Sequence, residues 1–167
     1  MSRSKKNASK NTHTAPTFQH SVSVQYAITD VAGIPVRATL RRWINVVLAN
    51  VPHEVALTLR FVDAEEGRAL NHDFRQKDYA TNVLTFEYGL DPDAQCLSAD
   101  IVICAPVIVR EAQEQNKTVR EHYAHMIVHG VLHALGYDHI KPKEAKVMES
   151  LEVELLARLG YANPYAD

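Results

Sequence analysis

The chain has 167 residues, of which 46% are hydrophobic and 23% charged, and this suits one soluble globular domain with its own core. Its formal net charge of −2 argues against a strongly cationic nucleic-acid-binding protein but leaves room for a local basic face. The two cysteines form no CxxC pair, and no apolar run approaches the roughly 20 residues that cross a bilayer, so we expect a cytoplasmic protein with no membrane partner.

Residues 1–20 are predicted to form a disordered basic arm. This segment has no acidic residue and is rich in Ser, Thr and Asn, and its basic residues are Arg3, Lys5, Lys6 and Lys10. It lacks the apolar stretch of a secretory signal. Three interpretations stay open: a solvated tail, a flexible arm attracted to phosphates, and a transit peptide.

The strands are predicted in the earlier part of the remaining domain, residues 21–167. Residues 21–28 alternate polar and apolar side chains, as a half-buried strand does. A helix then begins near Pro35 and carries apolar residues at helical spacing, namely Leu40, Trp43, Ile44, Val47 and Leu48. A strand is then predicted over residues 55–63, a short helix over 64–75 and a strand over 81–88. A turn over residues 89–95 leads to a last strand over 99–106.

The later part of the chain is predicted to be helical. Residues 107–115 form one helix, and Thr118 with Glu121 makes a capping box for a second helix, which ends at Gly136. A last helix opens at Pro142, and its expected buried face carries Val147, Leu151, Leu155 and Leu159. Because the strands come early and the helices late, we expect a single α+β domain with about five or six helices around one small sheet.

The stretch HGVLHALGYDH, residues 129–139, contains three histidines with the spacing of metal ligands. His129 and His133 are four residues apart on a helix, so their Cβ atoms share one face at roughly 6 Å. Gly136 ends the helix and lets the chain reverse, which brings His139 toward the same place. A histidine pair alone is often only packing, but all three features together predict a metal site. Three protein ligands leave one tetrahedral position for water, as in catalytic zinc sites.

The same spacing occurs in metzincin proteases, but those enzymes carry HExxH, whose Glu activates the metal-bound water. This chain has Gly130 at that position. The loss of a general base typically lowers a rate by roughly 10²–10⁴-fold. A metalloprotease-like hydrolase is therefore only a minor alternative.

Three neutral imidazoles leave the full charge on the ion, and such a site favours an anionic substrate such as a phosphodiester. A further cation is needed where charge develops on the phosphate. Arg60, between Leu59 and Phe61 on a predicted strand, is the candidate. The alternative is a strand arginine that reaches solvent or pairs with a carboxylate.

The histidine stretch closely resembles the HGxLHLxGYDH signature of the YbeY family, bacterial metal-dependent endoribonucleases that act in ribosomal RNA maturation. Further segments resemble the family in the same order, from about residue 22 to residue 165: LTLRFVD, ALNHDFRQKDYATNVLTF, ADIVICAP, AHMIVHG and MESLE. The eleven-residue motif is specific, and the other segments support it.

The resemblance implies one zinc ion per chain, held by His129, His133 and His139, and it implies that Arg60 lies in the same cleft. Arg60 and His129 are accordingly our candidate catalytic residues. The implied fold is a small mixed four-stranded sheet surrounded by helices. The implied activity is cleavage of single-stranded RNA in 16S rRNA 3′-end processing and ribosome quality control, with rRNA and the small ribosomal subunit or its assembly factors as partners.

Several residues are interpreted as neighbours of this site rather than as ligands. His122 and His125 share the histidine helix and are expected to pack there or to orient the ligands. Asp138 could orient a ligand, shuttle a proton or cap its loop. Asp100 and Asn82 are candidate cleft residues. Nickel or cobalt could replace zinc in vitro.

The chain departs from the usual family pattern at five positions, none of them a proposed ligand: Ala80, Thr85, Glu87, Ala99 and Ala134. These changes bear on RNA preference more than on metal binding. A rival hypothesis is a non-catalytic, zinc-containing, rRNA-binding ribosome assembly factor, in which Arg60 and the basic arm serve binding alone.

Overall fold

The computed structural model describes residues 18–166, which form four strands and five helices. The predicted basic arm lies outside the described residues except for its last three. Among these, the Nδ1 atom of His20 accepts a hydrogen bond from the backbone N–H of Val55, 3.1 Å away. No helix in this described range is long and apolar enough to cross a membrane.

The four strands make one mixed sheet, as expected. They are β1 (Ser21–Ala27), β2 (Glu54–Val62), β3 (Val83–Asp91) and β4 (Cys96–Cys104), in the order β1-β2-β4-β3. The pairs β1–β2 and β2–β4 are parallel, whereas β3 is antiparallel to β4 and forms one edge. The small mixed α+β fold inferred from the sequence is thereby confirmed.

The β3–β4 hairpin is longer than predicted, and the turn is shorter. Residues 89–91, expected in the turn, continue β3 and pair with the start of β4. The Oδ1 atom of Asp91 accepts hydrogen bonds from the backbone N–H groups of Asp93 and Ala94, and Gln95 adopts a left-handed φ of 51°. This tight Asx-type turn lets the pairing run to the very end of the hairpin.

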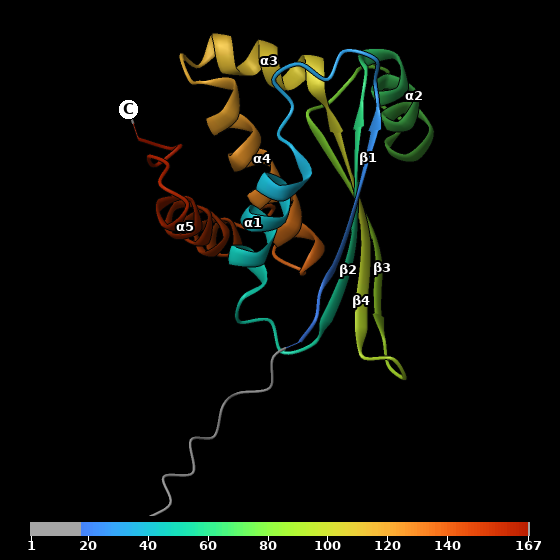
Figure 1. The fold of residues 1–167 in the computed structure, drawn as a ribbon, viewed down its shortest axis with the longest axis vertical. Coiled ribbons are helices and arrows are strands. Elements are labelled where there is room, and N and C mark those ends of the chain that lie inside the picture. The colour runs from blue at the N-terminus through green and yellow to red at the C-terminus, as the bar shows by residue number, and fades with distance from the viewer. Residues whose placement is uncertain (1–17, 167) are drawn as a thin grey trace, which may run out of the picture.

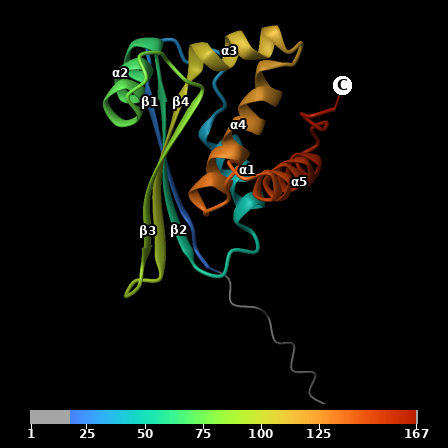
Figure 2. The same cartoon turned by 180° about the vertical axis from the view of Figure 1, so that it is seen from behind.

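The five helices lie on both faces of the sheet. They are α1 (Arg37–Leu48), α2 (Ala64–Arg75), α3 (Ala105–Glu114), α4 (Val119–Ala134) and α5 (Pro142–Arg158). Helices α1, α4 and α5 are gathered on one side of the sheet, whereas α2 lies on the other (Figure 1; Figure 2).

Alternation along the strands divides the apolar residues between two cores. Leu57, Leu59 and Phe61 of β2 face α1 and α4 in the larger core, where the Phe61 and Tyr123 rings meet edge to face at 5.9 Å. The opposite face carries a smaller core under α2, made of Val62, Leu84, Val102, Cys104 and Val107. Residues of β2 between those of the larger core, including Arg60, therefore point to the α2 side.

The N-terminus of α4 is capped as the sequence predicts. The Thr118 Oγ1 atom accepts a hydrogen bond from the backbone N–H of Glu121, 3.1 Å away. We expect Thr118→Ala to lower the free energy of unfolding by about 1 kcal/mol, because this N–H loses its partner. Chemical denaturation of the parent and the variant measures the change. Thr118→Ser keeps the acceptor and should stay close to the parent; an equal loss in both variants would contradict the capping role.

The buried face of α5 differs from the prediction. Val147 is 53% exposed and Leu151 and Leu159 are only half-buried. Leu155 is buried as predicted, and the other buried side chains of the helix are Met148, Glu152 and Leu156. A stripe of apolar residues alone does not include Glu152, a carboxylate that occupies a core position on the buried face.

Candidate metal centre

The three predicted ligands come together at the C-terminal end of α4. Their ring centroids are separated by 5.9 Å for His129–His133, 5.4 Å for His129–His139 and 5.3 Å for His133–His139. Gly136 adopts a φ of +102° directly after the helix, and this left-handed residue turns the chain back toward it. The helix and the loop thus place the three imidazole rings in one cluster.

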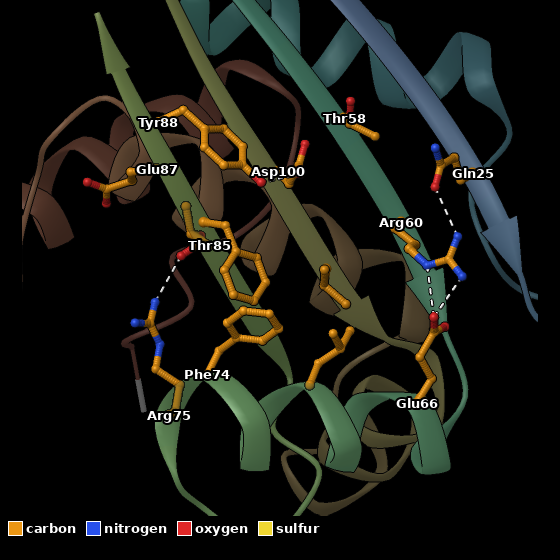
Figure 3. Close-up of a pocket in the computed structure, with 13 residues that line it drawn as sticks. Gln25, Thr58, Arg60, Glu66, Phe74, Arg75, Thr85, Glu87, Tyr88 and Asp100 are labelled. Carbon is orange, nitrogen blue, oxygen red and sulfur yellow. Dashed lines mark hydrogen bonds and ion pairs between the residues drawn. The ribbon is translucent and has the colours of Figure 1, made fainter.

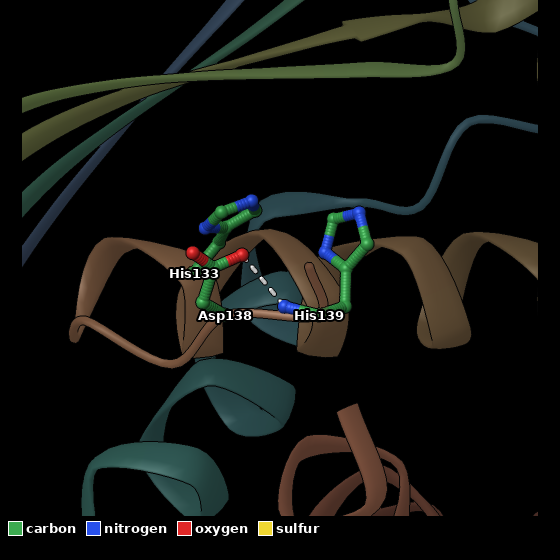
Figure 4. A group of neighbouring side chains, drawn as sticks. All are labelled: His133, Asp138 and His139. Carbon is green, nitrogen blue, oxygen red and sulfur yellow. Dashed lines mark hydrogen bonds between the residues drawn. The ribbon is translucent and has the colours of Figure 1, made fainter. Parts of the chain in front are cut away.

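Asp138 holds the returning loop and also brings a carboxylate oxygen close to His133 and His139. Its Oδ1 atom accepts hydrogen bonds from the backbone N–H groups of His139, at 2.7 Å, and Ile140, at 3.2 Å. One potential ligand atom each from Asp138, His133 and His139 all lie within 4.8 Å of one another (Figure 4). Nitrogens and an oxygen this close suit a Zn²⁺ ion, which binds both at about 2.0–2.2 Å.

His129 is oriented by Glu152, a residue that sequence reasoning missed. The Nδ1 atom of His129 lies 2.5 Å from the Glu152 Oε1 atom, and the Glu152 side chain is fully buried. Facing a carboxylate, Nδ1 carries the proton, so Nε2 is left with its lone pair for a metal. In the sequence, the sign of this role is one acidic residue, Glu152, on the helical face that also carries Met148 and Leu155.

Glu152 stays ionised despite its burial. Burial alone would raise its pKa, but hydrogen bonds from His125, His129 and Tyr165 outweigh that effect and lower the pKa to about 2. The His125 Nε2 atom lies 3.4 Å from the carboxylate, and the Tyr165 hydroxyl donates to it. Burial and the neighbouring Glu152 raise the pKa of Tyr165, so this hydroxyl keeps its proton. His125 thus contacts Glu152, which in turn contacts the proposed ligand His129.

The surroundings of His133 favour its uncharged imidazole. Burial lowers the pKa of His133, and the neighbouring His129 and His139 lower it further, against a smaller opposing effect of Glu87 and Asp138. A neutral imidazole is the form that binds a metal ion, so His133 fits the predicted zinc. Glu87, one of the departures from the family pattern, has its Oε1 atom 3.7 Å from His133 Nδ1.

Asn82 lines the histidine pocket, but its polar atoms are already engaged. Its Nδ2 atom donates to Glu111 at 3.0 Å, and its Oδ1 atom accepts from the backbone N–H of Val83 at 2.7 Å. The Nε2 atom of His122 lies 3.0 Å from the same Glu111 carboxylate, and burial keeps the pKa of His122 low. Asn82 and His122 therefore fix the loop that enters β3.

The pocket in front of the histidines measures about 280 Å³. Its remaining walls come from the start of β3 and from the end of α2. Gly130 does not line the histidine pocket, because this glycine packs against the sheet. A Cβ atom there would lie 3.1 Å from Ile101 Cγ2 and 3.2 Å from Val83 Cγ1. A glutamate of the metzincin kind at this position would press on Ile101 and Val83, which would have to shift to make room for it.

Arg60 lines a different depression from the histidines. It lies in a groove of about 870 Å³ on the α2 side of the sheet, as its place on β2 requires (Figure 3). Its Nη2 and Nε atoms donate to Glu66 Oε1, at 2.7 and 3.1 Å, and its Nη1 atom donates to Gln25 Oε1 at 3.0 Å. The groove and the histidine pocket share wall residues at the β3 edge, where they adjoin: Arg75, Thr85 and Glu87.

Asp100 lies in the groove with Arg60, not with the histidines. Its Oδ2 atom accepts a hydrogen bond from the Tyr88 hydroxyl, 2.7 Å away, which raises the pKa of that tyrosine. The structure thus brings ligand atoms of His133, Asp138 and His139 close to one another, with the His129 ring beside them and His125 in contact with Glu152. Arg60 and Asp100 form a second group on the other face of the sheet.

Comparison with known proteins shows to which family the chain belongs. The family model described as "Endoribonuclease YbeY" matches residues 9–160. The chain belongs to the YbeY family. The resemblance drawn from the histidine motif is therefore confirmed, and membership supports an endoribonuclease role for this YbeY chain.

Several curated relatives carry the same description, "Endoribonuclease YbeY". The protein of Bordetella pertussis is 54% identical over 152 residues, an alignment that covers 87% of this chain and 95% of the relative. Those of Janthinobacterium sp. and Nitrosospira multiformis are 53% and 50% identical, over 87% of this chain and 93% and 81% of the relatives. A solution structure of a Thermotoga maritima protein shares the fold, with a TM-score of 0.56 and 20% identity over 87% of this chain and 99% of that one.

Proposed function

We propose that this YbeY protein is a zinc-dependent endoribonuclease that cleaves single-stranded RNA in the cytoplasm. The observation that carries the proposal is the set of three imidazoles that converge at an open pocket, in a chain whose relatives are described as endoribonucleases. Its proposed role is 16S rRNA 3′-end processing and ribosome quality control. Its proposed partners are rRNA and the small ribosomal subunit or its assembly factors.

The proposed zinc ligands are His129, His133 and His139, with Asp138 beside them. When bound, the ion would polarise a phosphoryl oxygen and lower the pKa of a bound water. Glu152 keeps the proton on Nδ1 of His129 and so directs its Nε2 toward the pocket. Gly136 and Asp138 keep His139 folded back over the helix.

Arg60 is proposed to contact a phosphate some distance from the bond that is cleaved. Its groove adjoins the histidine pocket, but its guanidinium is held by Glu66 and Gln25. To bind a phosphate, Arg60 must exchange at least one of these partners. We therefore assign it a role in holding the RNA strand, and we expect it to act together with zinc rather than to replace it.

The test is cleavage of a labelled single-stranded RNA by purified protein, first depleted of metal with a chelator and then supplied with zinc. We expect cleavage only with zinc, and we expect Arg60→Ala to retain its zinc and its thermal midpoint while cleaving at least about tenfold more slowly. Zinc content is measured on every sample. Equal cleavage with and without zinc would overturn the proposal and would point to a contaminating nuclease.

The assembly-factor hypothesis predicts a different outcome. A non-catalytic factor would bind zinc and RNA without cleaving the RNA. Arg60→Ala would then weaken only a salt-sensitive binding equilibrium. Zinc-loaded protein that leaves the RNA intact, while binding it, would favour this second function.

A further inference from the structure

The histidine pocket and the Arg60 groove meet at Arg75, which lines both. This residue ends α2, and its Nη2 atom donates a hydrogen bond to the backbone oxygen of Thr85 on the edge strand β3, 3.0 Å away. Among residues 18–166, Arg75 is the one lysine or arginine on the wall of the histidine pocket. Any phosphate held at the histidines therefore has this side chain as its cationic neighbour.

Arg75 is also free to bind an anion. Within the described part of the chain it forms no ion pair, whereas Arg60 is paired with Glu66 and Arg68 with Asp78. Its guanidinium carbon lies 5.8 Å from the centre of the Phe86 ring, and its hydrogen bond to Thr85 uses one of five donors. The remaining donors can contact a phosphate in the forked manner that favours arginine.

An exposed aromatic surface adjoins Arg75 on the groove side. Phe74 is 60% exposed and meets Phe86 edge to face, with 5.1 Å between ring centroids. Tyr88 is 66% exposed on the same side of β3. Figure 3 shows Arg75 reaching the strand while the Phe74 ring stands over the groove. Aromatic faces beside a free arginine are the usual elements of single-strand binding.

The charges in the groove decide whether it favours the bases or the phosphates of an RNA strand. Three carboxylates, Glu66, Glu87 and Asp100, line it together with two arginines, so it does not favour a run of phosphates. Carboxylates do accept hydrogen bonds from the amino and imino groups of bases. The groove therefore suits bases, and Arg75 at its rim suits the backbone.

We propose that the RNA strand passes from the histidine pocket across the β3 edge into this groove, with a phosphate on Arg75 and the adjoining base stacked on Phe74. The proposal rests on the proposed endoribonuclease function and adds a path for the substrate. A base can stack on Phe74 only when its Watson–Crick partner does not hold it in a duplex. The path thus gives a physical reason for a preference for single strands.

The experiment compares two pairs of matched variants in the full-length, zinc-loaded protein. Arg75→Gln removes the free cation, whereas Arg68→Gln removes an exposed cation from the same helix that is already paired with Asp78. Phe74→Leu removes the aromatic face, whereas Phe74→Tyr keeps it. Binding of a labelled single-stranded RNA is measured at several salt concentrations, beside cleavage, zinc content and the thermal midpoint.

We expect Arg75→Gln to lower the slope of log affinity against log salt by about one unit relative to Arg68→Gln. We expect Phe74→Leu to weaken RNA binding by about tenfold or more relative to Phe74→Tyr, with zinc content unchanged. Equal behaviour within each pair would overturn the strand path while leaving the cleavage activity standing. If neither the parent nor any of the variants cleaves RNA, the proposed function fails. The two binding comparisons still decide whether the RNA strand follows the proposed path.

Discussion

We expect His139→Ala to abolish both zinc binding and RNA cleavage while the domain stays folded. His139 is exposed, and its ring makes no contribution to either hydrophobic core. Its backbone N–H, which is bonded to Asp138, is unchanged in the variant, so the loop keeps its turn. Two imidazoles then remain beside Asp138, whose Oδ1 atom already accepts two backbone hydrogen bonds in the loop, so the site loses one of its three proposed nitrogen ligands. We expect zinc affinity to fall by more than about 100-fold, beyond the usual effect of losing a residue that merely orients a ligand.

Zinc affinity is measured by competition with a chelating dye, and cleavage on a labelled single-stranded RNA. His53→Ala is the matched control, because His53 lines neither the histidine pocket nor the groove. It should bind zinc and cleave RNA like the parent. If His139→Ala retained full zinc affinity, the metal would have to be held without the returning loop, and the proposed ligand set would be wrong.

The histidine cluster was predictable because all of its determinants are local. The spacing of His129 and His133 follows from the helical repeat, and the reversal at Gly136 follows from the conformation that glycine permits. The start of α4 at Thr118 depends on a capping box within four residues. In each case the residues concerned are close in the sequence, so their backbone positions follow from local structure.

The position of Arg60 and the role of Glu152 were not predictable in this way. Strand alternation indicates that Arg60 points away from Leu59 and Phe61, but only the packing of α4 on the Leu59 side shows that the histidines lie on the opposite face. Glu152 is 23 residues from His129 and 13 from Tyr165. The contacts that make its burial favourable exist only once α4, α5 and the C-terminal segment have assembled.

We expect Glu152→Gln to weaken zinc binding by about 10- to 100-fold, the usual effect of replacing a group that orients a metal ligand. The amide keeps the shape of the side chain but loses the negative charge that holds the proton on Nδ1 of His129. Three donors now converge on that carboxylate, from His125, His129 and Tyr165, and a neutral amide oxygen is a weaker acceptor for them. The His129 ring can then adopt the other tautomer, with Nε2 protonated and unable to bind the ion.

Two variants separate this effect from a general loss of stability. Glu154→Gln, on the same helix and exposed, should bind zinc as the parent does. Tyr165→Phe removes one donor but leaves the Glu152–His129 contact, so it should lower zinc affinity less than Glu152→Gln does. Nitrogen chemical shifts of the His129 ring report its tautomer directly. If Glu152→Gln kept the Nδ1-protonated tautomer and full zinc affinity, then the buried carboxylate would serve only the packing of α5 against α4.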